Sequence, residues 1–467
     1  GPPSINGQPG DQTVCEGASA SFTVGAIDTS VSAGRGKKPP MKLNGSAPGG
    51  LSFQWRRNGI PLTNGGPFLG ANTATLSINP ATAAEAGSYD VVVSGTCSPP
   101  VISNPASLTV NSCSTLAPML ISEFRLHGSG GAQDEFIELY NISDTPADIS
   151  GYTLFALTAG GTQTLVFTVP GALGSNSTVV PARGHYLIAN SNGYSLGALA
   201  VADGTYTTDI VDGSGVALFG SAVPASGNRV DSVGFDNRDA LFFEGTPLAP
   251  AGGIIADGEY SFVRQFQANG LPQDTDDNAT DFVFISTTAG LFSGRSSVLG
   301  APGPEDLASP IMRNLTVAAS LVDPLAPAIA APNRTRDVTS DPANNSTFGT
   351  LTFRRHFTNN TGAPVTQLRL RIVNITTLPN PAGTADLRGR STVDAVVSLT
   401  AGGSVTVHGT TLQSPTQLLG GGLNSTLNAG VITLATPLAP GASVDVQFMV
   451  GVQSPGVFRF FVNVEAK

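Results

Sequence analysis

The residues that could bind a cation lie in one acidic stretch, residues 274–281 (DTDDNATD). Oxygen-bearing side chains alternate there at Asp274, Asp276 and Asn278, with Asp281 at the end. Alternating carboxylates and amides are how a loop wraps a hard cation such as Ca²⁺. An EF-hand is excluded, because Ala279 stands where that loop needs Gly and Ile285 where it needs the bidentate Glu. Two alternatives remain: a looser calcium loop, or an Asx-rich turn whose carboxylates cap backbone N–H groups, which we favour.

A second pattern, residues 193–197 (GYSLG), matches the G-x-S-x-G of a serine nucleophile. A nucleophile elbow requires a strand, this turn and then a helix, with an acid and a His further along the chain. The segment after Ser195 is a Gly/Ala/Thr loop, and the downstream His356 and His408 belong to another predicted domain. We therefore expect no serine hydrolase.

Four carboxylates near one another could serve acid–base chemistry on a sugar: Glu123, Asp134, Glu135 and Glu138. We expect Glu123 and Glu138 on adjacent strands beside Arg125, where charge pairing is the ordinary role. His127 and His185 have no second His at the spacing of zinc ligands. The sequence thus predicts no catalytic residue and no enzyme.

Composition excludes several classes of protein. The chain has 467 residues and a net charge of −10, and only 12% of its residues are charged. Its four lysines are Lys37, Lys38, Lys42 and Lys467, so no basic stripe is available for nucleic acid. No window approaches the ~18 consecutive apolar residues of a membrane span. The first residue is Gly, so we expect a processed chain or a fragment.

The first domain is predicted at residues 1–111. Residues 51–59 alternate around the single Trp, Trp55, and residues 84–93 place Tyr89 in an A-G-x-Y pattern. This segment resembles an immunoglobulin-type sandwich, in which the Trp lies in the core and the Tyr forms a corner before a central strand. Trp55 and Tyr89 are accordingly expected core residues.

The cysteines depart from the antibody pattern. Val91 holds the place of the second Cys, while Cys15 lies just before the predicted second strand and Cys97 just after the strand that follows Tyr89. We predict that Cys15 and Cys97 pair across one end of the sandwich, which implies an oxidising compartment. Cys113, in the linker, is expected to be a free or structural thiol.

The second domain is predicted at residues 112–300. Its pieces run in the order ISE, a Gly-rich loop, EFIELYN and DISGYTL between Ile121 and Leu154. This order resembles the lamin-tail domain, an immunoglobulin-like β-sandwich. The resemblance continues through residues 184–188, 230–235 and 274–278. It implies a fold but almost nothing about function, because this module decorates many unrelated extracellular proteins.

The third domain is predicted at residues 309–467, again as a β-sandwich. Residues 353–357 and 368–372 are interpreted as a hairpin whose outward face carries Arg369 and Arg371. Residues 444–450 and 458–464 alternate and are interpreted as a terminal hairpin. The predicted fold class is therefore all-β, with three consecutive sandwiches.

Asn-x-Ser/Thr triplets recur along the chain. We interpret them mainly as polar surface turns, with glycosylation as the alternative. The candidate acceptors are Asn141, Asn176, Asn278, Asn314, Asn333, Asn345, Asn359, Asn374 and Asn424.

These observations predict a non-catalytic, secreted or cell-surface structural or adhesive protein. We expect it to self-associate into a fibre or layer through strand edges or terminal segments. The alternative is an ancillary binding region of a larger secreted enzyme, as the bacterial occurrence of such modules implies, or a glycan-binding module. No cofactor is expected apart from the candidate calcium, and no nucleic-acid partner.

Overall fold

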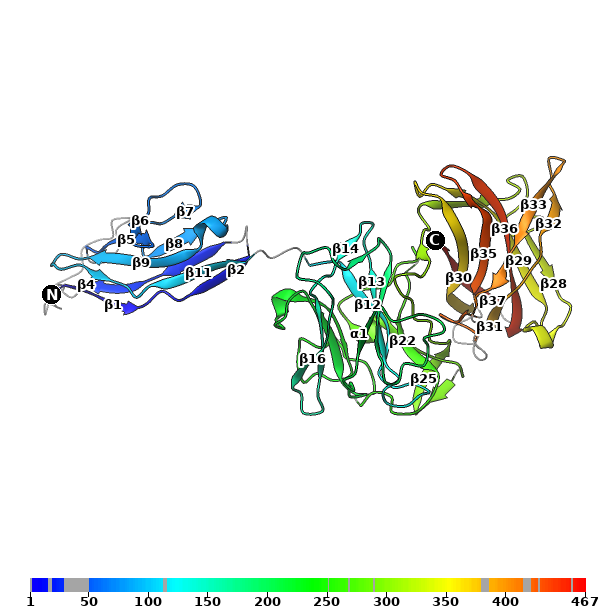
Figure 1. The fold of residues 1–467 in the computed structure, drawn as a ribbon, viewed down its shortest axis with the longest axis horizontal. Helices are drawn as coiled ribbons and strands as arrows, with labels where there is room; N and C mark the ends of the chain where they lie inside the picture. Colours follow the sequence, from blue (N-terminus) through cyan, green and yellow to red (C-terminus); the bar gives the residue numbers. More distant parts are fainter. Residues whose placement is uncertain are drawn as a thin grey trace, which may run out of the picture. The chain divides into compact units, whose positions relative to one another are not determined.

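The computed structural model describes residues 2–15, 19–28, 50–111, 116–250, 252–267, 269–288, 290–378, 386–414, 421–426, 429–454 and 457–467. The chain divides into two compact units, Gly1–Thr115 and Leu116–Lys467 (Figure 1). Strands dominate both units, and the described part contains one short α-helix, α1 (Asn278–Asp281). No helix in that part is long and apolar enough to cross a membrane. The predicted all-β class is confirmed.

The first unit is a sandwich of two sheets. One sheet has the order β2 (Gln12–Cys15), β11 (Ala106–Asn111), β9 (Gly87–Ser94), β5 (Ser52–Arg57) and β6 (Ile60–Pro61), with β10 (Val101–Ile102) also on β9. The facing sheet has the order β3 (Ala20–Thr23), β8 (Thr75–Ile78) and β7 (Phe68–Leu69). The N-terminal strand β1 (Pro3–Gly7) pairs with β4 (Gly25–Asp28). The N-terminal segment is therefore part of its own domain rather than a free donor strand.

The expected core residues of this unit are confirmed. Trp55 and Tyr89 are both fully buried, and Phe22 stacks on Tyr89 at a ring-centroid distance of 4.9 Å. The Tyr89 hydroxyl donates to the carbonyl of Glu85 at 2.6 Å, where η1 (Ala83–Glu85) leads into β9. This is the tyrosine corner of an immunoglobulin-like sandwich.

The predicted Cys15–Cys97 disulfide does not fit this topology. Along β11, Leu108 pairs with Gly87 at the start of β9, and three residues further Asn111 pairs with Cys15. Cys97 instead follows Ser94, the last residue of β9. The two cysteines therefore lie beyond opposite ends of an eight-residue strand, about 25 Å long at about 3.3 Å per residue.

A disulfide requires Cα atoms within about 7 Å, so this pairing is wrong. The prediction failed because it placed Cys15, at the end of β2, and Cys97, after the end of β9, at the same end of the sandwich. Cys97 is a free, exposed cysteine in the structure. Cys113 and the side chain of Cys15 lie outside the described residues.

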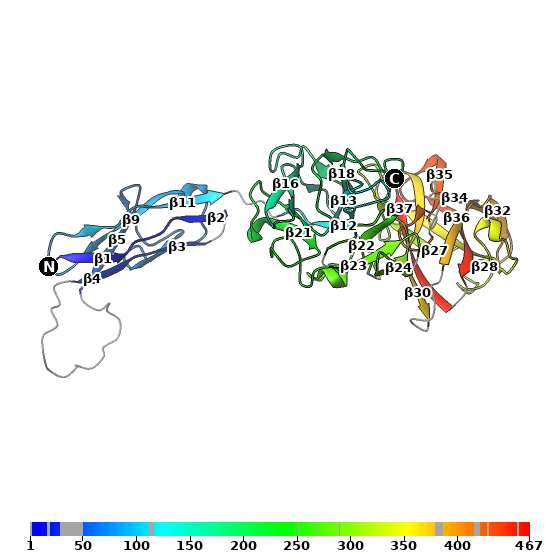
Figure 2. The same cartoon turned by 90° about the horizontal axis from the view of Figure 1, so that it is seen from below.

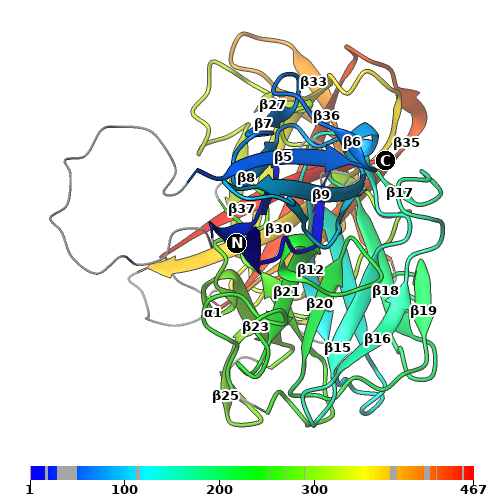
Figure 3. The same cartoon turned by 90° about the vertical axis from the view of Figure 1, so that its left-hand side faces the viewer.

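The second unit contains two sandwiches. In the first, the lamin-tail sandwich, an eight-stranded sheet runs β19 (Gly204–Tyr206), β18 (His185–Asn190), β13 (Phe136–Asn141), β12 (Met119–Arg125), β22 (Tyr260–Arg264), β23 (Phe282–Ser286), β25 (Arg295–Leu299) and β24 (Gly290–Phe292). A four-stranded sheet runs β16 (Gln163–Thr168), β15 (Thr153–Leu157), β20 (Gly215–Phe219) and β21 (Arg229–Gly234). Figure 3 shows β20, β15 and β16 side by side. The short β14 (Ala147–Asp148) and β17 (Val179–Val180) pair beside them.

One continuous apolar core fills this sandwich. Phe124 on β12 stacks on Phe262 of β22 with ring centroids 5.2 Å apart. Ile137 and Leu139 of β13 are fully buried in the same cluster, on one face of their strand, as their alternation predicts. The other face of β13, which carries Glu138 and Tyr140, is also buried. The C-terminal sandwich packs against this second face.

The C-terminal sandwich has a seven-stranded sheet with the order β27 (Val317–Leu321), β29 (Thr350–Asn359), β36 (Ser443–Ser454), β33 (Ser404–Gly409) and β32 (Ala395–Ser398). In addition, β28 (Arg334–Asp337) pairs with β29, and β31 (Asp386–Arg390) with β36. The other sheet runs β26 (Ile311–Met312), β37 (Val457–Ala466), β30 (Val365–Leu378), β35 (Ala429–Leu438) and β34 (Thr411–Leu412) (Figure 2).

Both hairpins predicted in this domain are wrong in their pairing, although their strands exist. β29 and β30 follow each other in sequence but lie in different sheets, and so do β36 and β37. β29 pairs with β36, and β30 pairs with β37. Alternation identifies a strand with one apolar face, but both sheets of a sandwich turn such a face inward. The pattern therefore cannot say which sheet a strand joins.

In four of the Asn-x-Ser/Thr triplets the Asn side chain is buried and hydrogen-bonds the backbone, instead of lying in a surface turn. Asn141, Asn278, Asn333 and Asn359 are fully buried. Asn359 donates from Nδ2 to the carbonyls of Ala363 and Leu438, while the Thr361 hydroxyl donates to Asn359 Oδ1 at 2.7 Å. Asn141 and Ser143 form the same turn in the lamin-tail sandwich, with Nδ2 donating to Thr145 four residues on.

Glycosylation at these four residues is therefore excluded, because the amide nitrogen that would carry the sugar is buried. Among the other candidates, Asn176 is exposed, and Asn314, Asn345, Asn374 and Asn424 are half-buried. Glycosylation at these five residues stays a prediction.

Candidate functional site

Seven ionisable side chains gather where the lamin-tail and C-terminal sandwiches meet. We call them the junction cluster: Glu123, Glu138, His185, Glu305, Arg369, Arg371 and Glu465, all of them buried. Strand register explains the grouping. Glu123 on β12 pairs directly with Glu138 on β13, and Arg369 on β30 pairs directly with Glu465 on β37. Glu305 comes from the segment between the two sandwiches.

Glu305 is the central acceptor of the cluster. Its carboxylate lies 2.8 Å from Arg371 Nη2 and 3.1 Å from His185 Nε2, and it also accepts from Arg369. Glu465 pairs with the same two guanidinium groups, at 2.9 Å from Arg371. Burial opposes the charge on Glu305, but the two arginines and His185 outweigh it and hold its pKa well below the ordinary value.

The lamin-tail side of the cluster is acidic. Glu138 accepts from His185 Nδ1 at 3.0 Å and from the backbone N–H of Glu305 at 2.6 Å. Glu123 accepts from the N–H of Gly303 at 3.1 Å and from Asn424 Nδ2 at 2.7 Å. Burial, assisted by the nearby Glu138, raises the pKa of Glu123 to about 8.

The junction cluster brings acidic and basic groups together in one buried network. Burial disfavours the charge on His185, but Glu305 and Glu138 outweigh burial and raise the pKa of its imidazole. His185, Arg369 and Arg371 pair with the carboxylates of Glu138, Glu305 and Glu465. Removing one member of such a network is costly, because its partner is left buried and uncompensated.

The space inside this cluster is too small for a substrate. The cavity that its residues line has a volume of about 30 Å³, which is room for about two water molecules. The Glu123–Glu138 pair therefore meets no open cleft in which it could act on a sugar. The predicted structural role of these carboxylates is supported, but their partners are His185, Asn424 and backbone amides rather than Arg125.

Arg125 instead pairs with another member of the predicted acidic set. It lies 2.6 Å from Asp134, and both side chains are fully buried. Ser195, the residue of the G-x-S-x-G pattern, donates from Oγ to Asp134 at 2.7 Å. Glu135 accepts from Asn190 and from the N–H of Ile210, and burial raises its pKa to about 8. No histidine in the part of the chain that the structure describes is hydrogen-bonded to Ser195.

The other three histidines also bond carboxylates. His127 lies between Asp212 and Asp257, at 3.2 Å and 2.8 Å. His356 lies 2.9 Å from Asp445, and His408 lies 2.9 Å from Asp394. These pairs lie on separate strands and loops.

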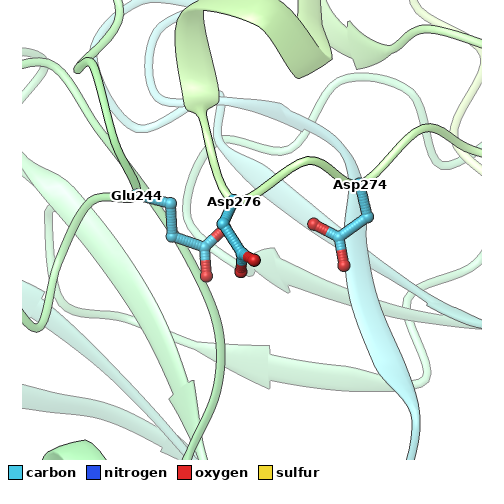
Figure 4. A group of neighbouring side chains, drawn as sticks. All are labelled: Glu244, Asp274 and Asp276. Carbon is cyan, nitrogen blue, oxygen red and sulfur yellow. The ribbon is translucent and has the colours of Figure 1, made fainter.

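The acidic stretch 274–281 splits into two groups with different surroundings. Asp274 and Asp276 approach Glu244, a residue from a distant loop, and the three carboxylates place ligand oxygens within 4.8 Å of one another (Figure 4). We call Glu244, Asp274 and Asp276 the acidic triad. Burial and the neighbouring Asp231 raise the pKa of Glu244 to about 9.

Asn278 and Asp281, the other two predicted ligands, are bound elsewhere. Asn278 accepts from the N–H groups of Gly234 and Glu244 and donates to the carbonyl of Ser232. Asp281 accepts from the N–H and hydroxyl of Thr275, both at 2.8 Å, and it is fully buried. The two side chains are structural, and the four-residue ligand set predicted from spacing is wrong in these two members.

A third feature is an apolar groove between the two sheets of the C-terminal sandwich. Its volume is about 430 Å³, and Arg355 and Arg459 lie among its lining residues. The apolar walls come from β29 and β36 on one side and from β30 and β37 on the other; they include Phe353, Phe357, Leu370, Phe448, Phe460 and Val462. Neither guanidinium is a nucleophile or a general base, so this groove suits binding rather than reaction.

Sequence reasoning missed three key residues of these sites: Glu305, Glu465 and Glu244. It noted Arg369 and Arg371 but placed them on an outward face, where charge is usually solvated. The available signal was the pattern itself, since two arginines alternate with Leu368, Leu370 and Ile372 in one strand. Such a strand has one apolar and one cationic face, and the cationic face requires acidic partners when it is covered.

The comparisons with known proteins agree with the fold. Residues 114–237 match the family model Lamin Tail Domain, so the lamin-tail resemblance is confirmed for this segment. Immunoglobulin-like and lamin-tail domains are generally non-catalytic, and immunoglobulin-like domains are typical of adhesive and structural extracellular proteins. The search of curated proteins finds no match.

Similar solved structures are immunoglobulin-like. The tandem Ig repeats of Dlar are 16% identical, with 23% of this chain and 48% of that chain covered and a TM-score of 0.18. The titin M3 domain is 18% identical, with 24% and 97% covered and a TM-score of 0.17. The N-terminal Ig1-2 module of the Drosophila receptor protein tyrosine phosphatase DLAR is 14% identical, with 42% and 93% covered and a TM-score of 0.18. These scores are too low to support an argument, so the fold assignment depends on the strands and the family match.

Proposed function

We propose that this chain is a non-catalytic structural or adhesive protein of the cell exterior, and that its copies associate into larger assemblies. The observation that carries the proposal is the junction cluster. Its carboxylates and its imidazole have the chemistry of an active site, yet they enclose about 30 Å³ and bind one another. Their role is to hold two sandwiches together.

Such a junction suits a protein that bears load. Two sandwiches joined by a flexible linker reorient freely, whereas a buried ion network fixes their contact. Breaking one buried pair costs about 3–5 kcal/mol because its partner is left uncompensated. Glu305 bonds both sandwiches, through Glu138 on one side and through Arg371 on the other.

Exposed sheet edges support association between copies. Among the described strands, four edge strands each carry a large apolar side chain that is at least 70% exposed: β6 with Ile60, β7 with Leu69, β24 with Leu291 and β32 with Val396. An edge strand presents unpaired backbone groups, and an apolar side chain beside them favours pairing with another chain. The final strand β37 pairs along its length with β30, while β26 pairs only with its last two residues, Glu465 and Ala466.

The test is the mass and shape of the purified chain. Light scattering coupled to size-exclusion chromatography, together with negative-stain electron microscopy, should show species larger than a monomer that grow with protein concentration. Leu291→Lys and Val396→Lys should reduce these species, because a charge on an edge strand opposes pairing. Val223→Lys is the matched control, since Val223 is 70% exposed but lies outside any strand.

A monomer at every concentration would overturn the association part of the proposal. Equal effects of all three lysine variants would overturn the role of the edges. Saturable binding on a glycan array by a monomeric chain would favour the alternative of a glycan-binding module.

A further inference from the structure

We infer that the acidic triad of Glu244, Asp274 and Asp276 is a binding site for a divalent cation, with Ca²⁺ as the best fit. The inference concerns the lamin-tail sandwich alone and is independent of the proposed function. Four observations support it: the three carboxylates converge, one buried oxygen has no hydrogen bond, the two loops are hydrogen-bonded to each other, and acidic groups outnumber basic ones there.

The first observation is the convergence of the three carboxylates. Glu244 comes from the segment after β21, and Asp274 and Asp276 come from the loop before α1. Figure 4 shows their side chains pointing toward the same space, and their ligand oxygens lie within 4.8 Å of one another. Oxygens this close can contact one Ca²⁺ together, because two opposite Ca–O bonds of about 2.4 Å span about 4.8 Å.

The second observation is an orphaned oxygen on Glu244. Its side chain is only 6% exposed, and Oε2 is inaccessible and has no hydrogen-bond partner. Arg264 Nη2 lies 3.8 Å from Oε2, beyond hydrogen-bonding distance. A buried carboxylate oxygen without a partner is costly. A cation bound between Glu244 and the two aspartates would satisfy it.

The loops that supply the ligands are fixed to each other by their backbones. The N–H of Asn278 donates to the carbonyl of Glu244 at 2.9 Å, and Asn278 Oδ1 accepts from the N–H of Glu244 at 3.1 Å. Asp277 accepts from the N–H of Thr246 at 3.0 Å. Gly245, with φ of +52°, permits this approach, because a Cβ there would lie 2.7 Å from the carbonyl oxygen of Asp276. The site is thus largely organised before a cation arrives.

The local charge favours a cation. Five carboxylates lie around the site, those of the triad together with Asp231 and Asp281, and two guanidinium groups face them. Arg264 lies 2.8 Å from Asp231 and 3.3 Å from both Asp274 and Asp281, and Arg229 lies 3.5 Å from Glu244. The acidic side chains around the site thus outnumber the basic ones by three.

The ligand chemistry distinguishes Ca²⁺ from other metals. All three groups are carboxylates, which hard cations prefer, and no His or Cys belongs to the cluster. Asp274 and Asp276 are exposed, so water can complete the six to eight ligands that Ca²⁺ takes. Mg²⁺ demands near-ideal octahedral geometry and is usually held by one or two carboxylates, whereas the flexible coordination of Ca²⁺ accepts three.

The experiment is calorimetric titration of Ca²⁺, and separately Mg²⁺, into the chelator-treated full chain. We expect one Ca²⁺ site with a Kd on the order of 10⁻⁴ M, as in extracellular modules, and weaker binding of Mg²⁺. Asp274→Asn and Asp276→Asn each remove one exposed ligand charge and should weaken Ca²⁺ binding at least about tenfold, while the pair together should abolish it. Asp209→Asn, at an exposed aspartate outside the triad, should leave binding unchanged.

Circular dichroism spectra of the variants would establish that they are folded. The absence of saturable heat with Ca²⁺ at millimolar concentration would overturn the inference, and it would mean that a proton rather than a metal satisfies Glu244. Unchanged Ca²⁺ binding in the double variant would also overturn it, because the cation would then bind elsewhere.

Discussion

Arg371 Nη2 lies 2.8 Å from Glu305 Oε2, and both side chains are buried. Arg371 stands on β30 of the C-terminal sandwich, while the backbone N–H of Glu305 donates to Glu138 of the lamin-tail sheet at 2.6 Å. Glu305 therefore connects both sandwiches, through its backbone N–H on one side and its carboxylate on the other. The stability of the unit Leu116–Lys467 should depend on it strongly.

Glu305→Gln should destabilise this unit by about 3–5 kcal/mol. The amide keeps the shape of the side chain but leaves Arg369, Arg371 and His185 with less negative charge than they need. Urea unfolding followed by circular dichroism measures the effect, and we expect the two sandwiches to unfold in separate steps once the connection is broken.

The matched control is Asp144→Asn. Asp144 pairs with Arg183 at 2.9 Å, but its side chain is 75% exposed, so the loss should be about 0–1 kcal/mol. Similar losses in both variants would contradict a special role for the buried network.

The junction cluster should also make stability depend on pH. The pKa of Glu123 is raised to about 8 in the folded chain, and that of His185 is raised above its ordinary value. Both groups thus hold protons in the folded chain that they release on unfolding. Their stabilising contribution is complete below the unfolded pKa values, about 4.5 for Glu and 6.5 for His, and is lost as pH rises through the folded values.

Glu305 acts in the opposite direction. Its pKa is lowered in the folded chain, so its contribution is present above the unfolded value of about 4.5 and is lost as pH falls through the folded one. We therefore expect the free energy of unfolding to be largest near about pH 4.5–5 and to fall by a few kcal/mol towards pH 8, since each pKa unit corresponds to about 1.4 kcal/mol.

Glu123→Gln tests this directly, because glutamine resembles the protonated carboxyl and does not titrate. Urea unfolding between pH 5 and pH 9 should show a shallower fall in the variant than in the parent chain. Asp144→Asn, at an exposed aspartate outside the junction cluster, should reproduce the slope of the parent profile. A Glu123→Gln profile as steep as the parent's would show that other groups set the dependence.

The tyrosine corner of the first unit offers an independent measurement. Tyr89→Phe removes the hydrogen bond from the hydroxyl to the carbonyl of Glu85, which should cost about 1–2 kcal/mol because that carbonyl loses its donor. Trp55 is the only tryptophan and lies beside Tyr89 in the core. Its fluorescence therefore reports the unfolding of this unit alone.

Tyr152→Phe is the reciprocal control. The Tyr152 hydroxyl accepts from the N–H of Ala117 at 2.7 Å in the second unit. That variant should leave the fluorescence transition of Trp55 unchanged. A shift of the Trp55 transition by Tyr152→Phe would contradict independent unfolding of the two units.

The buried asparagine turns should be intolerant of substitution. Asn359→Ala removes the Nδ2 donor from the carbonyls of Ala363 and Leu438 and the Oδ1 acceptor from Thr361. Leaving buried carbonyls unpaired costs about 1–3 kcal/mol. Asn360→Ala changes the exposed neighbour and should cost less than about 0.5 kcal/mol. Thermal unfolding compares the two variants. Equal midpoint temperatures would contradict a stabilising role for the buried Asn359 amide.

The strands were largely predictable, but their partners were not. Alternation locates β36 and β37 because a half-buried strand must place apolar residues at every second position. It says nothing about sheet membership, so each was given the wrong neighbour. Trp55 and Tyr89 were found because the immunoglobulin-like sandwich requires a large core side chain and a corner hydroxyl at characteristic places.

The sites were less predictable because they depend on contacts between distant segments. Asp274 and Asp276 were singled out from spacing, yet Glu244, about 30 residues earlier, is the third member of the triad. Arg369 and Arg371 face away from the core of their own sandwich, as predicted. They are buried all the same, because the lamin-tail sandwich and Glu305 cover them. No local pattern contains that information.

Cys97 should react as a free thiol in the native chain. It is exposed and unbonded, and Cys15 lies beyond the far end of β9. Iodoacetamide applied without a reductant should therefore alkylate Cys97, and mass spectrometry of the peptides should show the modified residue at nearly full occupancy. An unmodified native chain, with Cys97 alkylated only after reduction, would mean that a disulfide holds it. A linked Cys15–Cys97 peptide would in addition contradict the described register of β2, β11 and β9.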